Sequence, residues 1–233
     1  MFDFSNGGGV RRFLTDLIFP TRCPFCDGFI AYDRLCCEQC MDECRWTDEN
    51  ICPLCGKSVI KGCLCGKRLY DACICAAYYD GNAKKAIMSL KYEHDTQAAE
   101  VFGRVLRDML SVRGFDDIDT AVPVPLHRER LRERGYNQSE LIAREIVRGT
   151  DIELRTDVLR RKPPRAEQHT LAGSERSDAA KEQYESTGVS LEGKNVLLVD
   201  DVLTTGATLN ACTALLRAQG AARVICAAAV TVE

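Results

Sequence analysis

NVLLVDDVLTTGAT, residues 195–208, is the stretch that decides the fold of this chain. It begins with an apolar run over residues 196–199, which is typical of a strand buried on both faces of a parallel sheet. Two adjacent carboxylates, Asp200 and Asp201, follow this run. A turn of small and hydroxyl residues then leads into a helical pattern. The stretch therefore predicts a strand, a turn and a helix of an α/β fold.

The residues after the strand also indicate a ligand. In open α/β sheets, ligands bind beyond the carboxyl ends of the strands, and backbone N–H groups of a tight turn at a helix N-terminus favour phosphate. Paired carboxylates beside a phosphate site suit ribose hydroxyls and Mg²⁺, so the pattern indicates a phosphorylated ribose. A purely structural turn is the alternative, and an acid pair is an odd choice for one. The turn consists of Thr204, Thr205, Gly206, Ala207 and Thr208.

The composition sets broad limits. The 233 residues leave room for one ordinary domain and a small appendage. The formal net charge of -3 gives no global attraction to nucleic acid or membranes. No apolar run approaches the roughly 20 residues that span a bilayer, and Asp16 interrupts the apolar run at the N-terminus, which argues against a secretory signal. We therefore expect a cytoplasmic protein without a transmembrane segment.

Hydrophobic periodicity predicts three regions: an N-terminal segment over 1–20 with a short amphipathic helix, a cysteine-rich module over 21–70, and an α/β domain over 71–233. Alternating strands and helices in the last region imply a mostly parallel sheet flanked by helices. A polar, charged segment over 160–178 predicts a mobile loop. The expected strands are 72–79, 119–124, 195–200 and 222–231, and the expected helices are 10–18, 82–91, 95–112, 137–148 and 207–219.

Twelve of the 14 cysteines lie between Cys23 and Cys75, mostly in closely spaced pairs. A two-residue gap lets both thiolates of a pair reach one metal ion, so four pairs fit two closed, structural Zn²⁺ sites. Redox chemistry of the thioredoxin type lacks its βαβ context here. The predicted ligands are Cys23, Cys26, Cys37, Cys40, Cys52, Cys55, Cys63 and Cys65.

The assignment of these ligands leaves alternatives open. Sequential sites, 23/26/37/40 and 52/55/63/65, are the simplest arrangement, and an interleaved one is also possible. Cys63 and Cys65 are separated by one residue instead of two, and Cys73 and Cys75 could replace them, although their expected strand makes this less favourable. Cys44 is interpreted as a spare thiol, and so is Cys36 unless it competes with Cys37.

The charge of the cysteine module bears on nucleic-acid binding. Residues 21–75 carry 7 basic and 8 acidic side chains, and zinc sites with four thiolates add further negative charge. Since phosphate contacts dominate nucleic-acid affinity, the module alone is not expected to bind DNA strongly. A local basic patch of Lys57, Lys61, Lys67 and Arg68 leaves this possibility open.

A second anion site is predicted after the strand at 119–124. Four arginines follow the VPVP stretch at the carboxyl end of that strand, where a pyrophosphate would need donors. The alternative is a solvated charged turn in which Glu129 and Glu133 satisfy two of them. The residues are Pro125, Arg128, Arg130, Arg132 and Arg134.

The order of these motifs resembles the ComF family, bacterial proteins with a zinc ribbon fused to a type I phosphoribosyltransferase domain. After the cysteine pairs, the resemblance rests on Leu90-Lys91-Tyr92, on VPVPLHRERLRERGYNQ at 122–138, on Arg160, Gln168, Leu171 and Arg176, and on VLLVDDVLTTGAT at 196–208. The chain departs from the family pattern at three places. Arg165 replaces a Thr, Ala179 replaces an Asn, and the last cysteine pair is one residue closer.

The resemblance implies 5-phosphoribosyl-1-pyrophosphate (PRPP) with Mg²⁺ as the ligand. It implies that residues 204–208 cradle the 5-phosphate and that Asp200 and Asp201, the candidate catalytic residues, hold the ribose hydroxyls. The turn from Pro125 to Arg128, with Arg134 nearby, would face the pyrophosphate. The loop at 160–178 would close as a lid.

The family is associated with DNA uptake in natural competence, which implies single-stranded DNA and competence-machinery proteins as partners. The first functional hypothesis is therefore a PRPP-binding protein that handles single-stranded DNA. The alternative is an active phosphoribosyltransferase that uses an unidentified amine or nucleobase as acceptor. A purely structural zinc scaffold ranks last because it leaves the intact turn unexplained.

Overall fold

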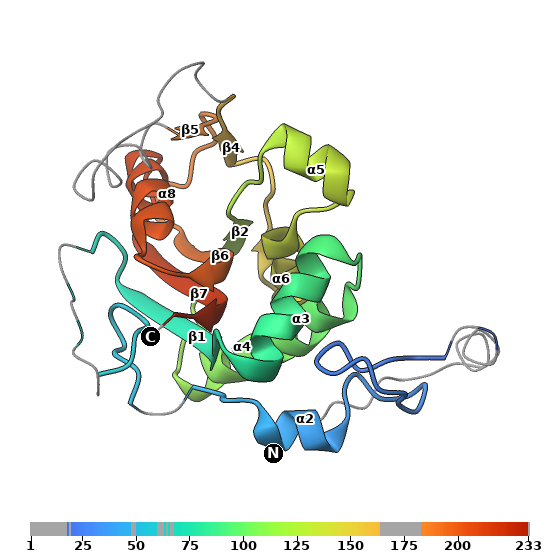
Figure 1. Cartoon of the computed structure of the whole chain (residues 1–233). Helices are drawn as coiled ribbons and strands as arrows, with labels where there is room; N and C mark the ends of the chain where they lie inside the picture. The colour runs from blue at the N-terminus through green and yellow to red at the C-terminus, as the bar shows by residue number, and fades with distance from the viewer. Residues whose placement is uncertain are drawn as a thin grey trace, which may run out of the picture.

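The computed structural model describes Ile18 and residues 20–47, 50–59, 63, 65, 68–163 and 183–232. Most of the helix expected over 10–18, and residues 164–178 of the predicted loop, lie outside the described residues. The chain forms an entirely parallel five-stranded sheet with helices on both faces (Figure 1). This confirms the predicted α/β class.

The sheet has β6 (Asn195–Leu203) at its centre. Its spatial order is β1 (Ala72–Tyr78), β7 (Arg223–Thr231), β6, β2 (Thr120–Pro123) and β3 (Glu153–Leu154). Residues 196–199 are all buried, and alternate positions enter two different hydrophobic cores, as expected for a strand covered on both faces. The strand continues beyond the expected end at residue 200, because Val202 and Leu203 still pair with β7. Asp200 and Asp201 therefore lie within β6.

The four helices predicted at 82–91, 95–112, 137–148 and 207–219 are present. The helices α3 (Gly81–Tyr92), α4 (Gln97–Val112) and α6 (Gln138–Val147) cover one face of the sheet, and α8 (Ala207–Ala218) covers the other (Figure 1). Phe102 of α4 and Ile142 of α6 are fully buried in the first core, and Leu216 of α8 is fully buried in the second. This arrangement brings the start of α8 and the start of α6 to the carboxyl ends of the strands.

Several short elements were not predicted. The arginine-rich segment forms a helix, α5 (Arg128–Arg134), which ends at Gly135 in the left-handed conformation with φ of 76°. The strands β4 (Leu159–Arg161) and β5 (Tyr184–Ser186) pair as an antiparallel ribbon. Figure 1 shows both α5 and this ribbon beyond the carboxyl end of β2.

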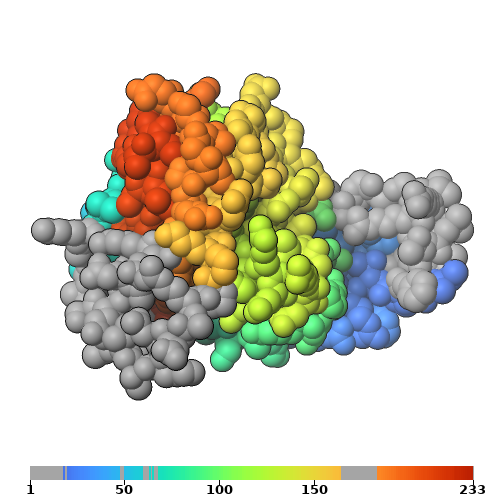
Figure 2. All heavy atoms as spheres, turned by 90° about the horizontal axis from the view of Figure 1, so that it is seen from above, coloured from blue at the N-terminus to red at the C-terminus, as the bar shows by residue number. Residues whose placement is uncertain are grey.

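The first part of the cysteine module contains α2 (Glu38–Glu43) and packs directly on the α/β domain. The ring of Phe25 lies edge-on to that of Phe102 in α4, with 5.8 Å between centroids, and Trp46 bridges to Ala77 of β1. Figure 2 shows this module beside the green helices at one side of the molecule. The two parts therefore share a core, and the boundary predicted at residue 70 stays a prediction. Among the described residues, no helix is long and apolar enough to cross a membrane.

Candidate phosphate site and metal centres

The two acids of β6 have different partners. Asp200 Oδ1 accepts a hydrogen bond from Ser139 Oγ, 3.1 Å away in the first turn of α6, and another from the backbone N–H of Asp201 at 2.9 Å. Asp201 Oδ2 pairs with Lys91 Nζ, 3.0 Å away at the end of α3. The Lys91 and Asp201 side chains are only 19% and 16% exposed, so water screens this ion pair weakly.

This pattern leaves one oxygen of each acid available. Among the described residues, Asp200 Oδ2 and Asp201 Oδ1 have no hydrogen bond or ion pair. Carboxylate oxygens accept hydrogen bonds from hydroxyl groups and are preferred ligands of Mg²⁺. The pair can therefore receive vicinal hydroxyls or a hydrated cation while Ser139 and Lys91 keep both side chains oriented.

The electrostatic environment raises the proton affinity of one of these acids. Burial, followed by the neighbouring charge of Asp201, raises the pKa of Asp200 from 3.8 to about 7. The Asp201 N–H, the Ser139 hydroxyl and the charge of Lys91 act in the opposite direction but do not cancel the effect. An approaching cation or hydroxyl donor favours the ionised form, so Asp200 would lose its proton when such a ligand binds.

The turn after β6 exposes backbone donors. Gly206 is the N-cap of α8 in the left-handed conformation, with φ of 77°, and as a glycine it supplies no side-chain cap. Thr204 and Thr205 are exposed, and the Thr205 hydroxyl accepts from the Ala207 N–H at 3.3 Å. The first N–H groups of an α-helix have no partner within it. The turn at 204–208 thus has the features of an anion site at the end of the 12-residue α8.

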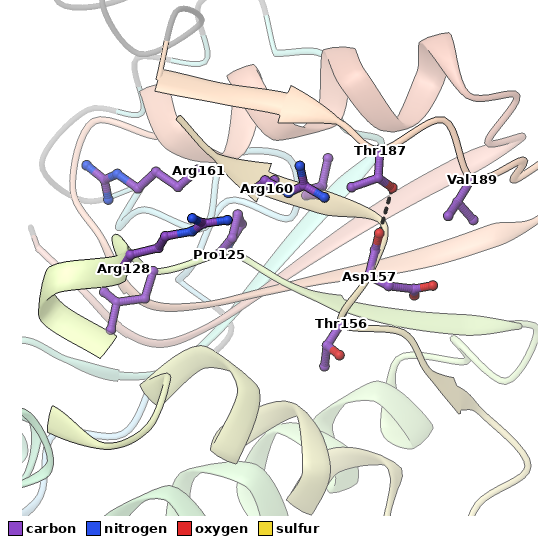
Figure 3. Close-up of a pocket in the computed structure, with 10 residues that line it drawn as sticks. Pro125, Arg128, Thr156, Asp157, Arg160, Arg161, Thr187 and Val189 are labelled. Carbon is purple, nitrogen blue, oxygen red and sulfur yellow. Dashed lines mark hydrogen bonds between the residues drawn. The ribbon is translucent and has the colours of Figure 1, made fainter. Parts of the chain in front are cut away.

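The segment predicted to face pyrophosphate lies beside the acid pair. Val124 N donates to Val199 O at 2.8 Å, and the Asn137 side chain donates to Val124 O at 2.9 Å. Pro125 and Arg128 line a cavity of about 460 Å³ that also receives Arg160 and Arg161 from β4 (Figure 3). A hydrogen bond from Thr187 to the Asp157 carbonyl closes the other end of the cavity.

Arg134 occupies a different place from Arg128. It is 8% exposed and does not line that cavity; its guanidinium lies over the Tyr92 ring, 5.1 Å from the centroid. Tyr92 follows Lys91 in the chain, so Arg134 contacts the neighbour of the residue that pairs with Asp201. The structure therefore places Pro125 and Arg128 together, whereas α5 carries Arg134 toward α3.

The cysteine sulfurs gather into two quartets in the sequential arrangement. Cys26 Sγ lies 3.8 Å from Cys37 Sγ, which matches the edge of about 3.8 Å for a tetrahedron with zinc–sulfur bonds of about 2.3 Å. Cys73 and Cys75, the alternative ligands, are buried in β1 outside both quartets, as are Cys36 and Cys44 elsewhere in the module. The quartets are Cys23, Cys26, Cys37 and Cys40, and Cys52, Cys55, Cys63 and Cys65, with sulfur atoms within 4.8 Å of one another.

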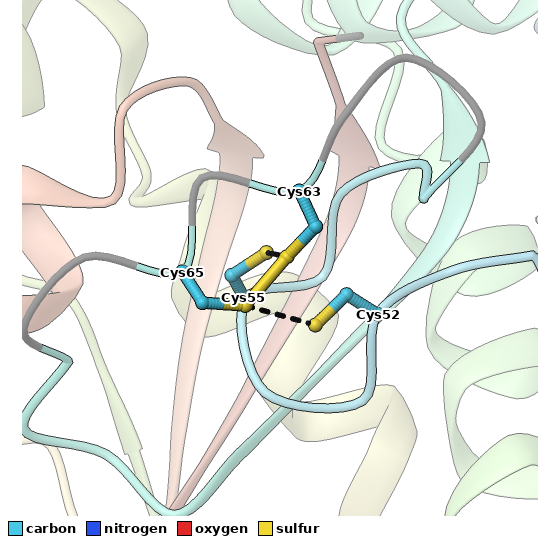
Figure 4. Close-up of a disulfide and its surroundings, with 4 residues drawn as sticks. All are labelled: Cys52, Cys55, Cys63 and Cys65. Atoms are coloured by element: carbon cyan, nitrogen blue, oxygen red, sulfur yellow. Dashed lines mark hydrogen bonds between the residues drawn. A yellow bond between two sulfur atoms is a disulfide. The ribbon is translucent and has the colours of Figure 1, made fainter.

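The second quartet is shown in Figure 4. Cys52 Sγ lies 3.2 Å from Cys65 Sγ, and Cys55 Sγ lies 3.1 Å from Cys63 Sγ. A disulfide joins Cys63 to Cys65. Because zinc binds thiolates, a zinc ion at this quartet requires the reduced form of both cysteines. Four converging sulfur ligands fit zinc in that form.

Sequence reasoning did not assign roles to three polar residues around the acids and the turn. Lys91 and Ser139 belong to the stretches that carry the family resemblance, but only the folded chain shows that they hold the acid pair. Arg68, from the end of the cysteine module, donates to the Thr205 carbonyl at 2.8 Å. No local pattern connects Arg68 to a turn that follows 137 residues later.

Comparison with known proteins agrees with this organisation. Residues 14–74 match the double zinc ribbon domain, and residues 134–233 match the phosphoribosyl transferase domain. DNA utilization protein YhgH of Escherichia coli K12 is 30% identical over 198 residues, which cover 81% of this chain and 86% of that protein. Competence protein ComFC of Bacillus subtilis is 25% identical, covering 88% of each chain. Competence protein F of Haemophilus influenzae is 27% identical, covering 87% of this chain and 93% of that one.

The fold and the paired domains define a phosphoribosyltransferase-like protein with an N-terminal double zinc ribbon. The double ribbon and its two cysteine clusters support Zn²⁺ binding. The chain belongs to the ComF family, as its similarity to YhgH, ComFC and competence protein F shows.

Proposed function

We propose that the chain binds PRPP with Mg²⁺ at the end of β6 and supports DNA uptake in natural competence. The observation that carries the PRPP assignment is the acid pair. Each acid has one oxygen without a partner among the described residues, and the pair lies shortly before a phosphate-type turn. In this proposal, residues 204–208 bind the 5-phosphate through backbone N–H groups. Asp200 and Asp201 bind the ribose hydroxyls and orient the Mg²⁺ complex, which neutralises charge on the pyrophosphate.

The arginine-lined cavity supports the position of the pyrophosphate in this proposal. Arg128, Arg160 and Arg161 place three guanidinium groups around one hollow next to the end of β2. Of these, Arg160 has a single, long ion pair with the carboxylates of the described residues, 3.9 Å from Glu185, so that part of the chain compensates its charge weakly. Guanidinium groups bind phosphate oxygens in a bidentate manner. The same guanidinium groups suit a phosphodiester, which supports single-stranded DNA as a partner. The names of the relatives, a DNA utilization protein and a competence protein, support the same proposal.

The eight quartet cysteines are proposed as ligands of two structural zinc ions. Four thiolates leave no open position on a tetrahedral metal, so these sites would support the fold and contribute no reacting group.

Titration of the zinc-loaded chain with PRPP and Mg²⁺ in a calorimeter tests the PRPP site. We expect Asp201→Asn or Thr205→Val to weaken binding by about 1–3 kcal/mol, which is the usual cost of losing a charge-assisted hydrogen bond. Asp117→Asn is the matched control, because Asp117 pairs with Arg223 at the opposite end of the strands. Absence of PRPP binding by the unaltered chain would refute the assignment.

The second candidate function is phosphoribosyl transfer to an amine or nucleobase. The intact acid pair favours it, because catalytic residues of this type stabilise positive charge that develops on the ribose during loss of pyrophosphate. Pyrophosphate release that depends on an added amine or base would establish the enzyme. Salt-sensitive binding of single-stranded DNA without such release would favour the DNA-handling role.

A further inference from the structure

The segments that carry the first and second quartets form the first and second zinc knuckles, and the end of the second lies beside the turn that follows β6. Arg68 lies three positions after Cys65 and donates from Nη1 to the Thr205 carbonyl at 2.8 Å. The next residue, Leu69, donates its N–H to Asn210 Oδ1, 3.1 Å away in the first turn of α8. Two consecutive residues of the zinc module therefore fix the turn and the start of α8.

The hydrogen bond from Arg68 sets the direction of a backbone donor. Thr205 C=O and Gly206 N–H belong to the same trans peptide, so the two groups point in opposite directions. While Arg68 holds the carbonyl on one side, the Gly206 N–H is directed to the other side. In the proposed PRPP complex this N–H is one of the donors to the 5-phosphate.

The lack of a side chain at Gly206 leaves the space that Arg68 and Tyr70 occupy. A Cβ at Gly206 would lie 2.6 Å from Arg68 Nη1 and 3.3 Å from the Tyr70 hydroxyl. Tyr70 is 2% exposed, and neither its hydroxyl nor Arg68 Nε has a hydrogen-bond partner among the described residues. No described carboxylate pairs with Arg68 either, so its positive charge adds to that of the α8 N-terminus. These features favour an anion at the turn.

The second knuckle also packs against the end of β6, just before the turn. Gly56 follows Cys55, and a Cβ there would lie 2.8 Å from Cys73 Sγ in β1 and 2.9 Å from the side chain of Leu203, the last residue before the turn. The equivalent position of the first knuckle is Asp27, which has φ of 62° and is exposed. Of the two positions compared, both among the described residues, the one in the second knuckle is therefore packed against the end of β6.

The first quartet makes its contacts on the other face of the sheet. Gln97 of α4 donates to the Leu35 carbonyl at 2.6 Å, and Asn82 of α3 donates to Cys40 Sγ at 3.7 Å. The two proposed zinc ions thus differ in what they support: the first supports α3 and α4, and the second supports the phosphate turn.

We propose that Arg68 is a positioning residue of the phosphate turn, and that zinc in the second quartet is thereby coupled to sugar-phosphate binding. This inference rests on the proposed PRPP site. Zinc orders the segment that carries Arg68, Arg68 orients the turn, and the bound phosphate stabilises the same arrangement. Because such coupling is reciprocal in binding free energy, PRPP raises the affinity of the second quartet for zinc and leaves that of the first unaffected.

The test uses the full zinc-loaded chain in reducing buffer. Binding of PRPP with Mg²⁺ is measured for the unaltered chain, Arg68→Met, Arg68→Lys and the control Arg107→Met, since Arg107 also donates to backbone carbonyls but lies on α4. We expect Arg68→Met to weaken PRPP binding at least about fivefold, within the usual range of coupling between two sites. Arg68→Lys should restore part of the affinity, and Arg107→Met should bind as the unaltered chain does.

Zinc release to a coloured chelator gives the second readout. At equilibrium with the chelator, PRPP is expected to increase retention of one of the two ions in the unaltered chain but of neither in Arg68→Met. A chain with Cys23→Ser and Cys26→Ser should keep the protected ion. PRPP binding by the unaltered chain together with equal affinity or equal zinc protection in Arg68→Met overturns the coupling and leaves the PRPP site standing. Lack of PRPP binding by the unaltered chain overturns both.

Discussion

The pH dependence of PRPP binding follows from the raised pKa of Asp200. Burial and the charge of Asp201 place this pKa at about 7. If the ligand requires the ionised carboxylate, the competent fraction of the chain is about one tenth at pH 6 and about nine tenths at pH 8. The apparent Kd for PRPP with Mg²⁺ should therefore fall about tenfold across this range. At pH 6 the binding reaction should release a proton from Asp200.

Calorimetry in two buffers of different ionisation enthalpy measures both the Kd and the proton release. The ligand itself titrates, because a phosphate monoester has its second pKa near about 6. Asp200→Asn is nearly isosteric and keeps an oxygen for the Ser139 hydroxyl. Because it mimics the protonated acid, it should bind more weakly than the unaltered chain at pH 8 and show only the pH dependence of the ligand. An unaltered chain whose pH profile coincides with that of Asp200→Asn would refute the reasoning.

The same pKa shift makes a statement about stability. Because the pKa of Asp200 is raised on folding, the native chain binds a proton that the unfolded chain releases near pH 4. This contribution to stability is complete below pH 4 and disappears as the pH rises to about 7. Asp200→Asn should therefore have a larger free energy of unfolding than the unaltered chain at pH 8, by at most about 4 kcal/mol, and a higher unfolding temperature. The difference should vanish near pH 4.

Three further predictions concern the supports of the site. Lys91→Met leaves Asp201 without its cation, so we expect a loss of about 1–3 kcal/mol in unfolding free energy. The pH midpoint of PRPP binding should also move to higher pH, because Lys91 lowers the pKa of Asp200. An unchanged midpoint would contradict this. Gly103→Ala places a Cβ 2.3 Å from that of Glu145 between α4 and α6, and thermal unfolding should show a loss of about 1–3 kcal/mol from overpacking, whereas an unchanged or higher unfolding temperature would argue against that contact. Metal analysis should find about two zinc ions per chain, one of which is lost when the first quartet is disrupted; loss of both would indicate shared ligands.

The central part of the fold could be predicted from the sequence because local patterns and tertiary structure agree there. Residues 196–199 are apolar at every position, and both faces of β6 are in fact covered. The helices α3, α4 and α8 were predicted for the same reason, since each buries one apolar stripe. Spacing made the sequential quartets the simplest arrangement but left an interleaved one, and a role for Cys73 and Cys75, open. The folded chain brings the sequential sets together.

Other features depend on contacts between distant residues. The helix α5 has almost no apolar periodicity, and its ends are set by the His127 side chain, which accepts from the Glu129 N–H, and by Gly135. The turn of this helix carries Arg134 away from the cavity that contains Arg128, which residue spacing does not show. The strand β3 has only two residues, too few for a recognisable alternation.

The polar partners of the acid pair and the turn also could not be predicted from local sequence patterns. The contact between Lys91 and Asp201 joins the end of one helix to the central strand, and the contact of Arg68 with Thr205 joins the zinc module to the turn. Each partner is an ordinary exposed residue type in the sequence. Folding makes them specific, because α3 and the second knuckle deliver them to the carboxyl end of β6.

A crystal structure of the zinc-loaded chain with PRPP and Mg²⁺ tests the central claim most directly. The account predicts the 5-phosphate on the backbone N–H groups of residues 204–208, with the ribose hydroxyls against Asp200 and Asp201. A sugar phosphate bound elsewhere, with both acids still turned only toward Ser139 and Lys91, would contradict it.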